Sequence, residues 1–312
     1  MRLFLKKLSV FAIFIVFLIS FLQVWLSIRI SGKTIRGHDN LEQTAGINAD
    51  LVFLGSSRCW QQFDPSFFDS AFRLRSVNIG VDGHTEIAMA IVRLNDYLAR
   101  NKAPRFAILS FDPFSSGGNP ENNLNFVHKN DFARYAFLPS EKNLGIVDYF
   151  KFNYCERYIP LYALFRYQLL SDCIFRNNID NYTIYGYERH EEAWDTVAKP
   201  ITAVMNKNYF RVSQINEISN SLNDLNILCQ AKGIKLICIQ TPVYRVIQDD
   251  SLFLKTKLIC SEIKIPFIDA NYKSIRDQIN FFCNSNHLNT RGVAAMNSFL
   301  RRDTMLNRIL RR

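Results

Sequence analysis

The chain has 312 residues, of which 48% are hydrophobic and 13% aromatic, and it carries a formal net charge of +10. This composition excludes an intrinsically disordered chain, which lacks the apolar residues needed to form a core. The positive charge does not indicate a nucleic-acid partner, because the sequence has no zinc-ligand spacing, recognition-helix motif or interleaved basic and aromatic residues.

A long apolar segment lies near the start of the chain. Residues 8–28 contain no charged side chain, and a helix of that length spans roughly 30 Å, the hydrocarbon thickness of a bilayer. Arg2, Lys6 and Lys7 precede it and favour a cytoplasmic N-terminus. We predict a transmembrane signal anchor over residues 1–30, a single-pass cell-membrane protein and an extracytoplasmic C-terminal domain. The alternatives are a cleaved signal peptide, although no Ala-x-Ala site follows, and a buried core helix.

The remainder of the chain is divided by composition. Residues 31–49 are polar and are predicted to form a juxtamembrane linker, and residues 50–312 a single domain. Strands are predicted at 50–54, 75–79, 105–111, 234–240 and 265–268, and helices at 84–100, 213–232, 252–263 and 292–301. Alternation of this kind predicts the α/β class, as a three-layer α/β/α sandwich with a mostly parallel sheet.

The alternation lapses at about residues 119–212, which we interpret as an aromatic-rich insertion packed over the edge of the sheet. Aromatic rings of this kind either pack into a core or, when exposed, stack on the faces of sugars. Both alternatives remain open for the ring-bearing residues Tyr135, Tyr149, Phe150, Tyr154, Tyr158, Tyr162, Phe165 and Tyr167.

Arginines are concentrated at the end of the chain. They either bind an anionic lipid or polyanionic glycan, or form a solvated helix end that aids solubility. The residues are Arg301, Arg302, Arg308, Arg311 and Arg312.

Seven cysteines leave at least one unpaired within the chain, and there is no CxxC motif. We expect Cys229 and Cys238 to be buried, because both lie in apolar patterns.

Two distant segments carry the residues of a nucleophilic site. The first predicted strand ends at Gly55-Ser56-Ser57, and His287 lies in a polar loop ahead of a short helical pattern. Parallel strands place their carboxyl ends at one edge of a sheet, where such folds hold their sites. A serine hydroxyl needs a base to take its proton. We predict Ser57 as the nucleophile and His287 as the base, with Ser56 as the alternative nucleophile.

These segments form an ordered set with a third. The block at 55–57, Val77-Asn-Ile-Gly80 and Asn284-Ser-Asn-His287 together resemble the blocks of the SGNH, or GDSL-type, hydrolases. The resemblance covers residues 50–115 and 232–300. It is closest to the membrane-anchored relatives involved in polysaccharide O-acetylation.

The resemblance implies a role for each residue. Ser57 would attack an acyl ester, His287 would take and return the proton, and Asn284 would orient the imidazole ring. The backbone N–H groups of Ser57 and Gly80 would hold the oxyanion that develops on the substrate.

Two departures from the family pattern bear on activity. Asn284 stands where the family has Asp, and a neutral amide stabilises an imidazolium less well than a carboxylate. Ser110-Phe-Asp-Pro113 replaces the family's Gly-x-Asn block, and Asp112 would repel an oxyanion. Asp112 is instead a candidate to position Arg58, and His84 is a candidate to supply the missing donor.

The expected function is that of a membrane-anchored serine ester hydrolase or O-acetyltransferase acting on a cell-envelope or secreted glycan, together with envelope acylation partners. No metal and no organic cofactor is expected. The alternative is a catalytically degenerate relative that binds glycan or scaffolds an envelope assembly. A second alternative is a lipid esterase or thioesterase, which would prefer long-chain esters.

Overall fold

The computed structural model describes residues 1–31, 43–111, 114–116, 129–130, 132–167, 183–198, 212–244 and 250–311. The chain forms two compact units. The N-terminal unit consists of Met1–Ile35 and Pro120–Asp180, and the sheet domain consists of Arg36–Asn119 and Asn181–Arg312. Asp112 and Arg312, which the sequence analysis singled out, lie outside the described residues.

The N-terminal unit begins with one long helix, α1, over Arg2–Ser31. Its Arg2–Arg29 segment is long and apolar enough to cross a membrane. Toward the end of α1, Gln23 and Leu26 are buried, and the Gln23 side-chain oxygen accepts a hydrogen bond of 2.7 Å from the Leu161 N–H. The last turns of α1 are therefore part of a folded module.

The rest of this module is made of short helices: η1 (Ala133–Tyr135), α7 (Leu144–Tyr149), α8 (Tyr154–Tyr158) and α9 (Tyr162–Arg166). Its aromatic residues divide into two groups. Tyr135, Phe150 and Tyr167 are buried. Tyr154 is 73% exposed and Phe165 is 64% exposed, so core packing accounts for only part of the aromatic stretch.

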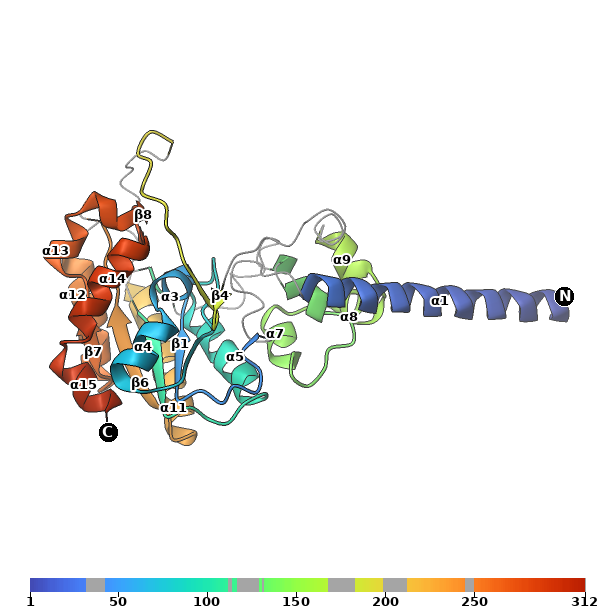
Figure 1. Ribbon diagram of the computed structural model, residues 1–312. Coiled ribbons are helices and arrows are strands. Elements are labelled where there is room, and N and C mark those ends of the chain that lie inside the picture. The colour runs from blue at the N-terminus through green and yellow to red at the C-terminus, as the bar shows by residue number, and fades with distance from the viewer. Residues whose placement is uncertain are drawn as a thin grey trace. The chain divides into compact units, whose positions relative to one another are not determined.

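The sheet domain is built on five parallel strands in the order β2-β1-β3-β6-β7 (Figure 1). The strands are β1 (Leu51–Leu54), β2 (Ser76–Asn78), β3 (Phe106–Ser110), β6 (Lys235–Gln240) and β7 (Phe267–Asp269). This arrangement confirms the predicted α/β class and the mostly parallel sheet. The chain order reverses between β1 and β3, and ligand sites of open parallel sheets form at such a point.

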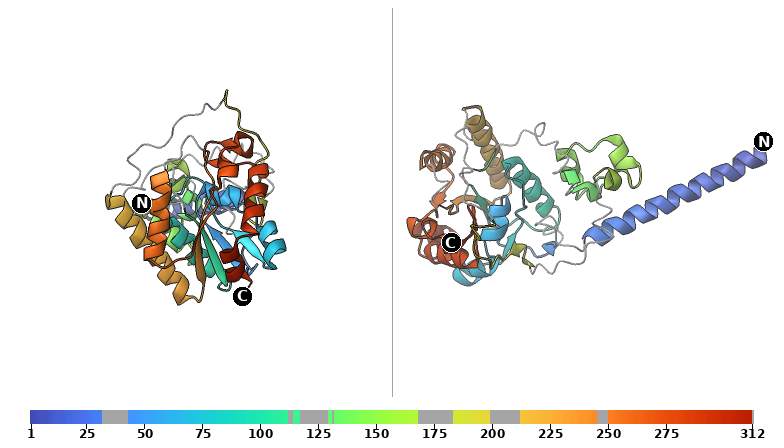
Figure 2. Two further views of the ribbon diagram at one scale, coloured as in Figure 1. Left: turned by 90° about the vertical axis from the view of Figure 1, so that its left-hand side faces the viewer. Right: turned by 90° about the horizontal axis from the view of Figure 1, so that it is seen from above.

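Helices cover both faces of this sheet, as the left view in Figure 2 shows. Successive side chains of a strand point to opposite faces, and accordingly Val52 and Leu54 join one apolar cluster while Leu51 and Phe53 join the other. The first cluster packs against α5 (Ile87–Leu98), α11 (Val212–Ala231) and α12 (Asp250–Glu262). The second packs against α3 (Ser57–Gln62), α4 (Pro65–Phe72), α14 (Thr290–Leu300) and α15 (Thr304–Leu310).

Smaller elements complete the domain: α13 (Lys273–Arg276), η3 (Ile279–Phe281), and the antiparallel pairs β4–β5 (Thr183–Ile184 and Tyr187–Glu188) and β8–β9 (Phe282–Asn284 and His287–Leu288). The β4–β5 pair lies within the stretch interpreted as an insertion, yet it belongs to the sheet domain. The Tyr185 carbonyl accepts a 2.8 Å hydrogen bond from the Asn78 N–H at the edge strand β2.

Of the predicted linker over residues 31–49, the described part at 43–49 makes contacts with the sheet domain. Thr44 and Ala49 are buried, and the Ala49 N–H donates a 2.9 Å hydrogen bond to the Tyr97 hydroxyl. These contacts anchor the residues just before β1 onto α5. The sequence composition does not predict this contact, because it joins a backbone N–H to the hydroxyl of a tyrosine that is distant in the sequence.

We predict that Gly292→Ala destabilises the sheet domain by about 1–3 kcal/mol, the usual cost of overpacking. A Cβ at this position in α14 would overlap the Phe281 carbonyl oxygen and lie 2.8 Å from a Leu288 methyl carbon. Chemical unfolding of the full chain in detergent measures the change. Ser298→Ala, at an exposed position of the same helix, is the control and should change stability by less than about 0.5 kcal/mol. Equal stabilities would refute the close packing at Gly292.

Candidate active site

The candidate nucleophile follows the carboxyl end of β1. Gly55 has a φ of 140°, and a Cβ there would lie 3.0 Å from the Cys59 Cβ and 3.1 Å from the Ser110 Cβ. Only glycine fits this turn without strain. The turn brings Ser57 to the first position of α3, beside the point where the order of the strands reverses.

Ser57 and His287 are in hydrogen-bond contact although 230 positions separate them in the sequence. The Ser57 Oγ lies 2.8 Å from the His287 Nε2, and the His287 Nδ1 lies 2.9 Å from the Asn284 Oδ1. If the Nδ1 carries the proton, it donates to Asn284 and leaves the Nε2 lone pair facing the serine hydroxyl. This is the geometry of a nucleophile, a base and an orienting group.

The orientation of the Asn284 amide follows from its backbone partners. Its Oδ1 also accepts hydrogen bonds from the N–H groups of Asn286 (3.1 Å) and His287 (3.0 Å). Two N–H donors at one atom require that atom to be the amide oxygen. The turn between β8 and β9 therefore presents an acceptor, and not a donor, to the imidazole ring.

Arg58 ties together the segments around these residues and is only 2% exposed. One terminal nitrogen donates to the Thr241 carbonyl at 2.8 Å, to the Thr241 hydroxyl at 2.7 Å and to the Pro242 carbonyl at 3.3 Å. The other donates to the Asn286 carbonyl. The guanidinium also lies over the Phe114 ring, 5.2 Å from its centroid. Arg58 thus positions the β8–β9 turn against α3.

Gly80 packs directly against α3. A Cβ at Gly80 would lie 2.9 Å from both the Trp60 backbone nitrogen and the Cys59 Cβ. The Asn78 amide donates to the Cys59 and Phe63 carbonyls, each at 2.9 Å. Its Oδ1 accepts the Gly80 N–H at 3.0 Å. This hydrogen bond competes with the oxyanion role predicted for the Gly80 N–H, which remains a prediction.

The other candidate residues are all buried but differ in their local partners. Ser56 is 9% exposed, and its carbonyl accepts hydrogen bonds from the N–H groups of Cys59 and Trp60 in α3. His84 is buried, with its Nδ1 3.8 Å from a Glu86 carboxylate oxygen. Ser110 stands where the family's third block would begin, and its buried hydroxyl has no hydrogen-bond partner among the described residues.

The environment of His287 disfavours its protonated form. Burial, the Arg58 guanidinium and then His190 together lower the pKa of His287 to about 3. An imidazole with this pKa is neutral at physiological pH, as a proton acceptor must be.

A second titratable pair lies near His287 and was not found from the sequence. The His190 Nε2 is 3.6 Å from a Glu188 carboxylate oxygen. Burial and then Asp82 raise the pKa of Glu188 to about 7. The His190 carbonyl accepts hydrogen bonds from the N–H (2.7 Å) and hydroxyl (3.0 Å) of Thr290. No motif marks Glu188 or His190, which lie in the aromatic-rich stretch, so only the fold reveals them.

Among the residues that the structure describes, no group of three or more His, Cys, Asp or Glu side chains is arranged to hold a metal ion.

Comparison with known proteins gives little further identification. No family model matches the sequence, and no curated protein matches it. Among solved structures, a suspected acylhydrolase from Bacteroides fragilis NCTC 9343 is similar over 84% of this chain and 88% of that protein, at 14% identity and a TM-score of 0.39. This likeness is too low to assign a family.

We predict that His287 makes the folded state less stable as the pH falls. The unfolded chain takes up a proton near pH 6.5, whereas the folded chain does so only near about pH 3. Between these values the unfolded state binds more protons, so stability falls by up to about 1.4 kcal/mol per pH unit from this residue. Chemical unfolding at about pH 7 and at about pH 5 measures this change in the free energy of unfolding. His287→Gln should lose less stability over this interval, and an unchanged loss would contradict the shift.

Proposed function

We propose that the sheet domain is a serine acyl-ester hydrolase or acyltransferase of the SGNH type. The observation that carries the proposal is the continuous chain of contacts from Ser57 through His287 to Asn284 at the carboxyl edge of the sheet. Taken alone, a Gly-Ser-Ser turn or a histidine in a loop is common. Here the serine and the histidine lie at hydrogen-bond distance, and Asn284 orients the imidazole through its other ring nitrogen. This is the arrangement that activates a serine.

In the proposed reaction, the Ser57 Oγ attacks the ester carbonyl and its proton passes to the His287 Nε2. The Ser57 N–H stabilises the oxyanion. The Gly80 N–H contributes if it divides its hydrogen bond between the Asn78 Oδ1 and the oxyanion. Collapse of the tetrahedral intermediate breaks the ester bond, and His287 returns the proton to the leaving alcohol. Water or a sugar hydroxyl then takes the acyl group from the serine, with His287 acting as the base again.

The proposed setting is the outer face of the cell membrane, with α1 as an uncleaved anchor and an acetylated envelope or secreted glycan as the substrate. The hydropathy of Arg2–Arg29 supports the anchor. The exposed rings of the N-terminal unit, among them Tyr154 and Phe165, are suited to stacking on sugars. Envelope acylation proteins are the expected partners.

One observation favours a second candidate, a glycan-binding protein that has lost catalysis. Neutral Asn284 stabilises an imidazolium poorly, and the low pKa of His287 makes it a weak base. In a well-studied triad, a change from Asp to Asn lowers turnover by about 10⁴-fold. We retain the enzyme as the first candidate, because the oxygen of Asn284 faces the ring and fixes the reactive tautomer.

We predict that Ser57→Ala abolishes hydrolysis of p-nitrophenyl acetate and labelling by a fluorophosphonate probe, because no other group attacks the ester. Ser56→Ala, a matched change at the adjacent residue, should keep both. Mass spectrometry of the labelled full chain locates the adduct. Loss of activity only in Ser56→Ala would transfer the nucleophile to Ser56. Absence of labelling in the unmodified chain, under conditions that label a control hydrolase, would favour the binding protein.

We predict that Asn284→Asp raises the pKa of His287 and increases kcat. A carboxylate accepts the same three N–H bonds and adds a charge that stabilises the imidazolium. The acidic limb of the pH profile of kcat/KM should move to higher pH. Asn284→Ala removes the acceptor and should lower kcat/KM by about tenfold or more. Equal pH profiles for all three proteins would show that residue 284 does not act through His287.

A further inference from the structure

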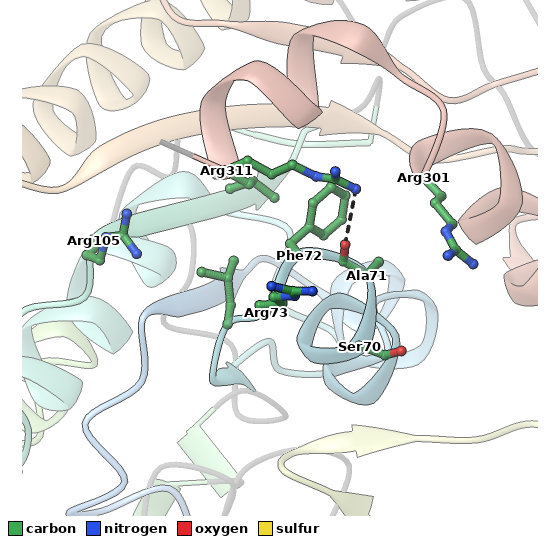
Figure 3. Close-up of a pocket in the computed structure, with 9 residues that line it drawn as sticks. Ser70, Ala71, Phe72, Arg73, Arg105, Arg301 and Arg311 are labelled. Atoms are coloured by element: carbon green, nitrogen blue, oxygen red, sulfur yellow. Dashed lines mark hydrogen bonds between the residues drawn. The ribbon is translucent and has the colours of Figure 1, made fainter.

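A pocket of about 740 Å³ lies in the sheet domain, and four of the nine residues that line it are arginines (Figure 3). The arginines come from four separate segments. Arg73 ends α4, Arg105 immediately precedes β3, Arg301 ends α14 and Arg311 ends α15. The volume falls within the range of about 300–1,000 Å³ that is typical of small-molecule sites.

The pocket lies at the opposite edge of the sheet from the candidate active site. Arg105 stands directly before the first residue of β3, whereas Ser57 follows the last residue of β1. Because these strands are parallel and adjacent, their amino and carboxyl ends are on opposite edges. The pocket is therefore not a subsite of the serine.

The positive charge in the pocket is not neutralised by neighbouring carboxylates. No acidic side chain lines it, and within the described part of the chain none of the four arginines pairs with a carboxylate. Arg311 donates only one long bond, 3.5 Å, to the Ala71 carbonyl, as the dashed line in Figure 3 marks.

The simplest alternative is that these arginines only complement helix ends. Three helices, α4, α14 and α15, end at the pocket, and a helix C-terminus carries roughly −0.5 elementary charge. Together they offset about −1.5 of the four positive charges. More than half of the charge is left for a ligand, and helix capping does not require the four side chains to share one cavity.

We propose that this pocket binds a phosphate-bearing ligand, either a free phosphate ester or diphosphate, or the headgroup of an anionic phospholipid. Guanidinium groups bind phosphate through paired hydrogen bonds. A phosphate group concentrates nearly two negative charges and three acceptor oxygens in one small volume, which suits a pocket lined by several arginines better than a single carboxylate does. The ligand neutralises the pocket and draws together α4, α14 and α15.

The test uses the full chain in neutral detergent, with inorganic pyrophosphate as the probe and calorimetry as the readout. Arg301→Ala should weaken binding by about tenfold or more, since it removes a charge-assisted contact. Arg302→Ala is the matched control: the adjacent arginine has the same charge, but it does not line the pocket and bonds to Ser298 instead. It should change affinity by less than about twofold.

Equal weakening by the two variants would overturn the proposal, because it would indicate diffuse attraction to a basic surface. If Arg301→Ala unfolds, Arg105→Ala takes its place, since Arg105 lies before a strand and not at a helix end. Ser57→Ala should bind pyrophosphate with unchanged affinity. The anion site and the proposed catalysis can therefore fail independently.

A second readout separates the two sources of phosphate. Phenylglyoxal modifies exposed arginines, and mass spectrometry locates the modified residues. In phosphatidylcholine nanodiscs, protection of Arg73, Arg105, Arg301 and Arg311 by pyrophosphate indicates a soluble ligand. Protection by phosphatidic acid in the nanodisc, without added pyrophosphate, indicates a lipid headgroup. Protection of Arg302 to the same degree, or of none of the four by either probe, overturns the proposal.

Discussion

The candidate site depends on the burial of one cation. Arg58, a residue of α3, reaches the loop after β6 and the β8–β9 turn, where it donates hydrogen bonds to the carbonyls of Thr241, Pro242 and Asn286 and to the Thr241 hydroxyl. Burying a charge is costly unless its hydrogen bonds are satisfied. The three segments are therefore held in the arrangement that supplies those oxygens. Because Asn286 lies between Asn284 and His287, the same arrangement fixes the distance from His287 to Ser57.

Arg58 also affects the protonation of His287. Burial lowers the pKa of His287 most, the Arg58 charge lowers it further, and Asn284 adds no countercharge. A carboxylate at position 284 would offset Arg58 electrostatically, whereas the amide only orients the ring. The site combines good geometry with a weak base. For the proposed reaction, this combination predicts slow turnover, or turnover that depends on a group brought by the substrate or a partner.

Much of the sheet domain could be predicted from the sequence, because it rests on local patterns. Strands β1, β3 and β6 lie in short apolar runs, and α5, α11 and α14 have apolar residues at helical spacing. The rule that parallel strands share a carboxyl edge predicted the position of Ser57, whereas its pairing with His287, which lies in the antiparallel β8–β9 pair, was expected from the ordered set of sequence blocks. The sequence could not show Glu188 and His190 near His287, because that proximity depends on β4–β5 joining the edge strand through the Asn78–Tyr185 hydrogen bond. Nor could composition show that the Ala49 N–H bonds to the Tyr97 hydroxyl of α5.

The C-terminal arginines illustrate the same limit at a finer level. In the sequence Arg301 and Arg302 are equivalent members of a basic tail, but a helix turns by about 100° per residue, so the two side chains meet different surroundings. Arg301 faces the pocket and Arg302 folds back along α14. The strand β3, five residues long, separates the arginines from the serine edge by roughly 16 Å. A ligand held at the pocket reaches Ser57 only if it is longer than that, so the two sites are suited to different molecules or to distant parts of one.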